Sequence, residues 1–160
     1  IEARYNCAKA TAAARLGAGA RPKVYYGGFY IGFGAAYPSP TSADAWYAKL
    51  IEDAGAELVV YDWEASNATQ FALGIQEADF WIYSDGNFNA TTYTFNAPFL
   101  NNPYANYPEE LQAKAVPAWV NQKVFDVIKT TTLQNYFEAR PAEYDVLLAD
   151  FVEVIWGSTG

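Results

Sequence analysis

Short runs of strand-forming residues recur along the chain, and segments with a helical period separate them. The runs Lys23–Tyr26, Glu57–Tyr61, Phe80–Tyr83 and Val124–Val127 predict β-strands. Phe80–Tyr83 is apolar throughout, which is typical of a central strand buried on both faces. Because strands that alternate with helices build parallel sheets, the pattern predicts an α/β fold. We expect a single Rossmann-like lobe with a mostly parallel sheet of roughly four to five strands and helices on both faces.

Helical period marks the segments between these strands. An Ala-rich helix is predicted at Glu2–Leu16, and shorter helices are predicted at 68–76 and 108–114. Ser42 can cap one further helix, and Pro141 suits the first turn of the last one. The positions expected to face the core are Ala43, Trp46, Tyr47, Leu50, Ile51 and Ala54 in the helix after Ser42, and Tyr144, Leu147, Leu148, Phe151, Val154 and Ile155 in the last helix.

Three segments lack a helical period. Residues 27–34 combine glycine with aromatic residues, and we interpret them as a loop after the first strand. Residues 85–107 are rich in Asn, Thr, Tyr, Phe and Pro, and they predict a long ordered loop with a short extra strand at Thr91–Phe95. Residues 133–140 predict an aromatic loop. Loops as long as 85–107 usually carry function or pack against a partner.

The best candidate site lies where the loops after three strands meet. Open parallel sheets bind ligands outside the carboxyl ends of their strands, and the loops after the first three strands all reach that edge. Aromatic walls with few charges suit a hydrophobic ligand, a sugar face or another protein surface. Packing of the same rings within the lobe or against a neighbouring subunit is an equally open alternative. The expected ligand-binding residues are Tyr26, Phe29, Tyr30, Phe33, Trp63, Asn87 and Phe88.

The residue inventory argues against an enzyme. The sequence contains no His, so catalytic triads and His-rich zinc sites cannot be built. The glycines of 27–34 lack the GxGxxG spacing and the Lys-Ser/Thr pair of a P-loop. The carboxylate pairs Glu77/Asp79 and Glu109/Glu110 lack an acidic cluster and are interpreted as helix-end and solvent charges. We therefore expect a non-enzymatic chain with no catalytic residue, cofactor or bound metal.

Charge and hydropathy limit the partners. The 160 residues carry 18 acidic and 10 basic side chains, a net charge of −8, which disfavours binding to nucleic acid or to an anionic membrane surface. No apolar run approaches the roughly 20 residues that span a bilayer. The hydrophobic fraction of 52% is sufficient for one domain core.

Several features favour a secreted, periplasmic or extracellular protein. The triplets Asn67-Ala-Thr69 and Asn89-Ala-Thr91 fit the N-glycosylation pattern and fall in polar, turn-like positions. The sequence contains no Met, which predicts that Ile1 is a processed or truncated end and that a targeting signal would lie upstream. Cys7 has no partner for an internal disulfide; we expect a small buried residue on the first helix, or a bridge to another segment or chain.

The order of these elements resembles the C-terminal lobe of the helical-backbone (class III) periplasmic binding proteins, the substrate-binding proteins that deliver vitamin B12, siderophores and haem to ABC importers. The first helix resembles the end of the helix that joins the two lobes of that family. The resemblance therefore implies an inter-lobe-type helix at 1–19 and a binding lobe at 20–160. The segments that carry it are Lys23–Gly28, Ala45–Val59, Glu77–Ile82, Ala118–Val127 and Arg140–Asp150.

The departures from the family bear on function. Members hold their ligand between two lobes, and this sequence matches one lobe. Members that dock onto a permease carry an acidic residue at the start of the short helix before the third strand, where this chain has Gln70 and Phe71. Nearby Glu64 would supply the acid only with a different loop register. Coupling to an importer is therefore in doubt.

Two functions of different classes follow. The first is a non-enzymatic ligand-binding lobe that takes a small molecule, with an N-terminal lobe upstream. The second is a structural or accessory subunit of an extracellular, glycosylated assembly, a filament or a multi-subunit complex, that reuses the binding-protein fold and can include a homo-oligomer. Its basis is the single lobe and the many loop aromatics, which are enriched at interfaces.

Overall fold

A computed structural model describes residues 1–32, 35–62, 67–84, 88–89, 92–95, 107–126 and 143–157. Its centre is a four-stranded sheet in the order β4-β1-β5-β8. The strands are β1 (Lys23–Tyr26), β4 (Glu57–Leu58), β5 (Phe80–Tyr83) and β8 (Val124–Asp126), and each pairing between them is parallel. The predicted α/β fold and the interior position of Phe80–Tyr83 are confirmed, whereas β4 is shorter than predicted. The predicted strand Val124–Val127 is confirmed as far as Asp126, and Val127 lies outside the described residues.

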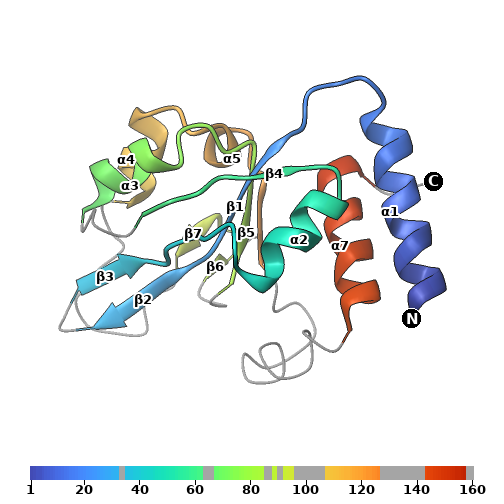
Figure 1. Cartoon of the computed structure of the whole chain (residues 1–160). Helices are drawn as coiled ribbons and strands as arrows, with labels where there is room; N and C mark the ends of the chain where they lie inside the picture. The colour runs from blue at the N-terminus through green and yellow to red at the C-terminus, as the bar shows by residue number, and fades with distance from the viewer. Residues whose placement is uncertain are drawn as a thin grey trace.

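Helices cover both faces of this sheet (Figure 1). One face carries α1 (Glu2–Leu16), α2 (Trp46–Asp53) and α7 (Tyr144–Trp156). The other carries α3 (Ala68–Gly74), α4 (Tyr107–Ala113) and α5 (Pro117–Val120). The short helix α5 was not predicted, because four residues are too few to show a helical period.

Alternation along the strands divides the core into two clusters. In β1, Val24 and Tyr26 belong to the cluster under α2 and α7, while Tyr25 belongs to the cluster under α3 and α4. In β5, Phe80 and Ile82 join the first cluster, and Trp81 and Tyr83 join the second. The second cluster is largely aromatic; its buried rings are Tyr25, Phe29, Tyr61, Phe71, Trp81, Tyr83, Phe88, Tyr107 and Trp119.

The loop predicted at 27–34 was wrong. The chain forms an antiparallel hairpin there, in which β2 (Phe29–Gly32) pairs with β3 (Ala35–Pro38), with Phe29 opposite Pro38. The hairpin projects away from the carboxyl end of the sheet (Figure 1). Its aromatic and β-branched residues favour extended backbone, and the glycines obscured that signal. A second small hairpin pairs β6 (Phe88–Asn89) with β7 (Thr94–Phe95), so the extra strand predicted at Thr91–Phe95 is confirmed in part.

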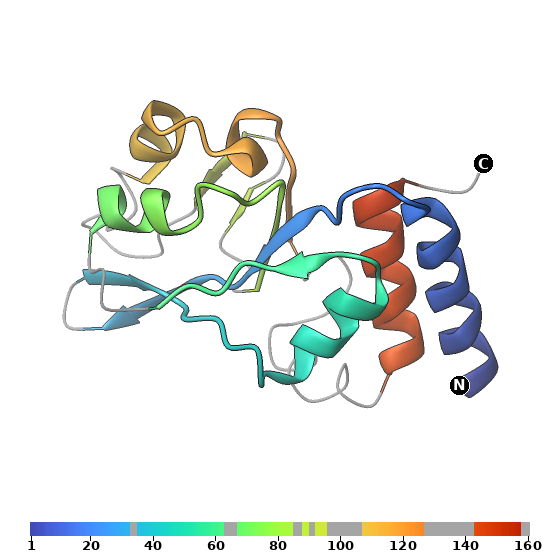
Figure 2. The same ribbon diagram turned by 45° about the horizontal axis from the view of Figure 1, so that its top comes forward.

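Polar contacts fasten α1 to the lobe. Arg4 Nε lies 2.7 Å from a carboxylate oxygen of the buried Asp145 in the first turn of α7. Tyr5 and Lys9 both reach the carboxylate of Asp53 at the end of α2. The two views show α1 lying beside α7, with the starts of α1, α2 and α7 at the same end of the molecule (Figure 2). In the parts of the chain described above, no helix combines the length and the hydropathy of a membrane span.

Candidate functional site

The chain leaves the neighbouring strands β1 and β5 toward opposite faces of the sheet. After β1 it goes through the β2–β3 hairpin to α2, and after β5 it goes to α4 and α5. Such a topological switch point opens a crevice at the carboxyl ends of the two strands, where α/β proteins bind ligands. We call this side of the sheet the carboxyl edge, and we take it as the candidate site.

Gly27 is the first residue beyond β1 at this edge, and it is held against β5. Its N–H donates to Ile82 O at 3.0 Å, and its carbonyl oxygen accepts from the indole Nε1 of Trp81 at 2.8 Å. Because Trp81 is fully buried, this carbonyl is satisfied inside the protein. Both backbone groups of Gly27 are therefore hydrogen-bonded at the carboxyl edge.

The base of the β2–β3 hairpin is also tied to the sheet. The Tyr25 hydroxyl donates to Ser39 O at 2.8 Å, and Ser39 N donates to Gly28 O at 2.8 Å. Thr41 Oγ1 accepts from Tyr61 N at 2.5 Å, and Thr41 N donates to Tyr61 O at 3.0 Å. These bonds join the segments that follow β1, β3 and β4, so the base of the hairpin is fixed at the carboxyl edge.

Replacing Gly27 by alanine is expected to lower the free energy of unfolding by about 1 kcal/mol, the usual contribution of one hydrogen bond. The new Cβ would lie 2.8 Å from Tyr25 Oη and 3.2 Å from Ser39 Cβ, and would push the Tyr25 hydroxyl away from its acceptor. Urea unfolding of Gly27→Ala, Tyr25→Phe and the double variant measures the coupling between the two positions. An equal cost of Gly27→Ala in both backgrounds would contradict this explanation.

The sequence-predicted ligand residues divide into two groups. Tyr26, Phe29 and Phe88 are buried: Phe29 packs against Phe71 and Tyr107, and Tyr26 packs beneath α2. The structure therefore places these rings in the core clusters beside the edge. Phe33, Trp63, Asn87 and the side chain of Tyr30 lie outside the described residues. A role in ligand contact stays a prediction for all seven.

The two positions matched to the docking acid have different surroundings. Gln70 is exposed in the first turn of α3, and its N–H donates to Asn67 Oδ1 at 2.9 Å. Phe71 is fully buried in the aromatic cluster. An acidic side chain would therefore find room at position 70 but not at position 71. Glu64 lies outside the described residues.

An apolar hollow of about 560 Å³ opens at the same end of the molecule, on the α2 and α7 face. Seven residues line it, and we call this site the aromatic hollow: Ile1, Glu2, Tyr5, Trp46, Lys49, Leu50 and Tyr144. Trp46 and Tyr144, which were predicted to face the core, are 37% and 42% exposed. Both stand at the first residue of their helices, which begin at the carboxyl edge of the sheet, so they extend past the core. The helical period assigned both residues to the face of the helix that turns toward the core, but it could not show that the first residue of each helix lies beyond the core.

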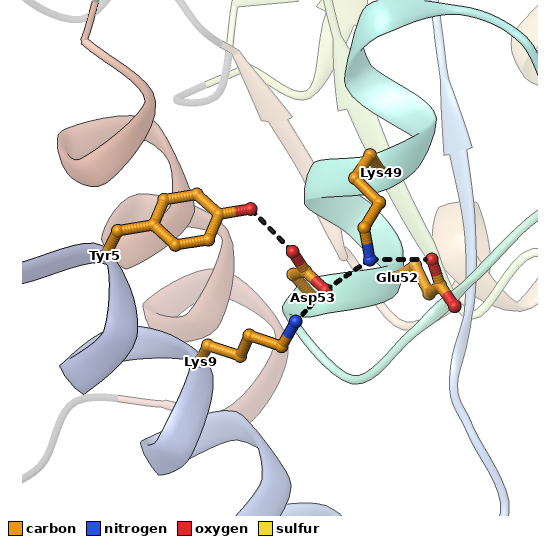
Figure 3. A network of polar contacts seen from close by, with 5 residues as sticks. All are labelled: Tyr5, Lys9, Lys49, Glu52 and Asp53. Atoms are coloured by element: carbon orange, nitrogen blue, oxygen red, sulfur yellow. Dashed lines mark hydrogen bonds and ion pairs between the residues drawn. The ribbon is translucent and has the colours of Figure 1, made fainter. Parts of the chain in front are cut away.

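Tyr5 and Lys49, which line the hollow, belong to a network of polar contacts with Lys9, Glu52 and Asp53 (Figure 3). The buried carboxylate of Asp53 accepts from the Tyr5 hydroxyl at 2.6 Å, from Lys9 Nζ at 2.8 Å and from Lys49 Nζ at 2.6 Å. Lys49 Nζ also contacts Glu52 Oε2 at 3.0 Å. Sequence reasoning missed this network, because its members come from two helices far apart in the chain.

The network shifts the acidity of its members. Desolvation by burial raises the pKa of Asp53, but hydrogen bonds from Lys49, Lys9 and Tyr5 outweigh it and lower the pKa to about 2. Burial, with the hydrogen bond to Asp53, raises the pKa of the Tyr5 phenol to about 12. The hydrogen bonds to Asp53 and Glu52 raise the pKa of Lys49. Asp53 therefore stays ionised and Tyr5 stays neutral at physiological pH.

The buried phenols near the edge do not offer a general base. Burial raises the pKa of Tyr61 and of Tyr107 to about 12, so both hydroxyls are protonated at neutral pH. Among the residues that the structure describes, no three His, Cys, Asp or Glu side chains are grouped closely enough to hold a metal ion.

The carboxylate pairs occupy structural positions. Glu109 and Glu110 lie in the first turn of α4, where the helix dipole favours negative charge. Asp79 Oδ2 accepts from the backbone N–H of Lys23 at 2.8 Å at the start of β1, and Glu77 forms an ion pair with the Lys23 ammonium. Helix-end and solvent charges were predicted, and the bond from Asp79 to the strand backbone adds a structural role.

The predicted glycosylation sites and Cys7 lie at the surface or near it. The side-chain oxygen of Asn67 caps α3, and Asn67 is exposed. Asn89 lies in β6, is half-buried, and its Oδ1 accepts from Thr92 N at 3.1 Å. Glycosylation of either residue stays a prediction. Cys7 was expected to be buried, and this was wrong: it is exposed, in a groove between α1 and α7, because α1 turns its Tyr5 and Ala12 side inward instead.

Comparison with known proteins gives a likeness of fold. No family model and no curated protein sequence matches the chain. A solved ABC transporter substrate-binding protein from Listeria monocytogenes EGD-e matches 96% of this chain and 54% of its own, with 14% identity and a TM-score of 0.47. A solved periplasmic binding protein from Veillonella parvula DSM 2008 matches 99% of this chain and 50% of its own, with 13% identity and a TM-score of 0.51.

The chain thus spans about half the length of the solved structures that it matches. The Veillonella structure carries the likeness, since its TM-score is above 0.5 and it covers nearly the whole chain. The strand order and the helical layers indicate an α/β fold with a parallel sheet, and this match agrees with that fold. The chain has the α/β fold that makes up about half of a periplasmic binding protein.

Proposed function

We propose that the chain is the non-enzymatic, ligand-binding lobe of a solute-binding protein that works outside the cytoplasm. The observation that carries the proposal is the switch point between β1 and β5, where the chain leaves neighbouring parallel strands toward opposite faces. The fold shared with about half of a periplasmic binding protein supports it. In this proposal the chain is the C-terminal lobe of a helical-backbone binding protein, and a second lobe closes over the carboxyl edge.

The hydrogen-bonded residues at the carboxyl edge suit this role. Gly27, Ser39 and Thr41 are fixed by the hydrogen bonds described above, so the lobe offers a preformed surface to a ligand. Preorganisation raises affinity because fewer groups lose freedom on binding. The neutral phenols and the fold of a binding protein favour reversible binding over catalysis.

Native mass spectrometry of the protein purified from its source tests the proposal. We expect a polypeptide about twice as long as this chain that releases a small molecule when it is denatured. An 18-kDa species that carries no small molecule and elutes as a large assembly would contradict it. That outcome would favour a structural subunit of an extracellular assembly.

A further inference from the structure

The surface of the aromatic hollow is mostly apolar, although two charged residues, Glu2 and Lys49, also line it. The Lys49 ammonium is held by Asp53 at 2.6 Å and by Glu52 at 3.0 Å, and Glu2 is exposed to solvent. The Tyr5 hydroxyl, also beside the hollow, donates to Asp53. Most of the exposed apolar surface comes from Ile1 and from the rings of Trp46 and Tyr144, while Leu50 is buried beneath them.

The ring of Trp46 is supported from below. Tyr26, at the end of β1, stacks on Tyr47 with ring centroids 4.2 Å apart. Trp46 meets Tyr26 edge to face at 6.0 Å and Tyr47 at 5.7 Å. Tyr26 is buried, so the exposed indole rests on a fixed aromatic base. Binding to such a ring orders few further side chains.

The size of the hollow indicates the kind of occupant. Its volume of about 560 Å³ lies inside the range of roughly 300–1,000 Å³ found for small-molecule sites. Its seven lining residues are far fewer than the roughly 20–30 residues on each side of a standard protein interface. A sugar would find the Glu2 carboxylate as an acceptor, but its other hydroxyl groups would face mostly apolar surface, which costs affinity.

We propose that the aromatic hollow binds an uncharged small molecule with a flat apolar face, held between the rings of Trp46 and Tyr144. The inference rests on the proposed function, because it names the ligand class for the same end of the lobe. Tyr26 then acts as a positioning residue: it supports Trp46 and does not contact the ligand. This gives the predicted site residue Tyr26 a defined task.

Fluorescence titration of the 160-residue chain with N-phenyl-1-naphthylamine, a neutral probe that brightens in apolar sites, tests the inference. Trp46→Ala and Tyr144→Ala are each expected to raise the Kd about tenfold, which corresponds to roughly 1.4 kcal/mol. Trp46→Phe keeps a ring and is expected to keep the Kd within about threefold. Nuclear Overhauser effects between the naphthyl protons and the Tyr144 ring are expected in the wild-type chain.

Matched controls come from exposed apolar residues elsewhere. Leu73→Ala and Val60→Ala, at positions 44% and 61% exposed and away from the hollow, are expected to leave the Kd unchanged. Near-ultraviolet circular dichroism checks that every variant is folded. Unchanged probe affinity in folded Trp46→Ala and Tyr144→Ala would overturn the inference. Competition by methyl glucoside or benzoate at lower concentration than by unlabelled naphthalene would also overturn it.

The two proposals fail separately. A purified native protein that carries no small molecule, together with Trp46-dependent probe binding, would end the proposed transport role and leave the hollow as an apolar site. If the native protein carries a solute, and the Trp46→Ala variant still binds both that solute and the probe with unchanged affinity, the transport role stands and the hollow is not the binding site. Only the second result contradicts the inference drawn here.

Discussion

Replacing Phe71 by alanine is expected to lower the free energy of unfolding by about 3–5 kcal/mol. Phe71 is fully buried, and truncation would remove its transfer free energy and leave a cavity among rigid rings. Its ring lies within 5.3–5.7 Å, centroid to centroid, of five other rings, those of Tyr25, Phe29, Tyr61, Trp81 and Tyr107. Such pairs contribute beyond their buried area.

Urea unfolding followed by circular dichroism measures this effect. Leu73→Ala is the control on the same helix: Leu73 is largely exposed, and its loss is expected to cost less than about 1 kcal/mol. If Phe71→Ala lowers the free energy of unfolding no more than Leu73→Ala does, the Phe71 ring is not central to the packing of the aromatic cluster. The outcome also bears on function, because a residue on which the core depends cannot be exchanged for a docking carboxylate.

The sequence predicted the sheet well because buried strands depend on local composition. Phe80–Tyr83 and Lys23–Tyr26 were placed to the residue, as was the helix Glu2–Leu16. Each is a run in which hydrophobic burial and intrinsic propensity agree. Glu57–Tyr61 was placed correctly but too long, since β4 pairs only with Lys23 and Val24 although β1 continues to Tyr26. Val124–Val127 is confirmed from Val124 to Asp126, and Val127 lies outside the described residues.

The candidate site was harder to predict, because it depends on which way each ring turns. Tyr25 and Tyr26 are adjacent and chemically identical, yet alternation along β1 places them in different core clusters. Phe29 was predicted at a cleft wall, and the structure places it in the aromatic core. Aromatic composition alone indicates a ring-rich edge. It does not separate rings that fill the core from rings that meet a ligand.

The exposed rings were missed for a different reason. Helical period assigns Trp46 and Tyr144 to apolar faces, and both faces do turn toward the core. Neither pattern shows where a helix begins relative to the edge of the sheet. The polar network behind these rings was missed as well, since Tyr5 and Asp53 are 48 positions apart. Only the packing of α1 against the lobe brings them together.

Replacing Asp53 by asparagine is expected to lower the free energy of unfolding at pH 7 by roughly 2.5 kcal/mol. The folded pKa of about 2 lies below the ordinary value of 3.8, so the ionised carboxylate is favoured in the folded state. Above about pH 4 the wild-type chain has this stabilisation in full. Between pH 4 and pH 2 the unfolded state binds more protons than the folded state, so the stabilisation declines and is lost below about pH 2.

The difference between wild type and Asp53→Asn is therefore expected to shrink on acidification and to fall to about half by pH 3. Urea unfolding at pH 7, 4 and 3 measures it. Glu52→Gln is the matched control: Glu52 also contacts Lys49 but is exposed, and its loss is expected to cost less than about 0.5 kcal/mol at every pH. A difference for Asp53→Asn that stays constant from pH 7 to pH 3 would show that packing, and not the charge of Asp53, fastens α1 to α2. The position of α1, which lines one side of the aromatic hollow, would then not depend on this network.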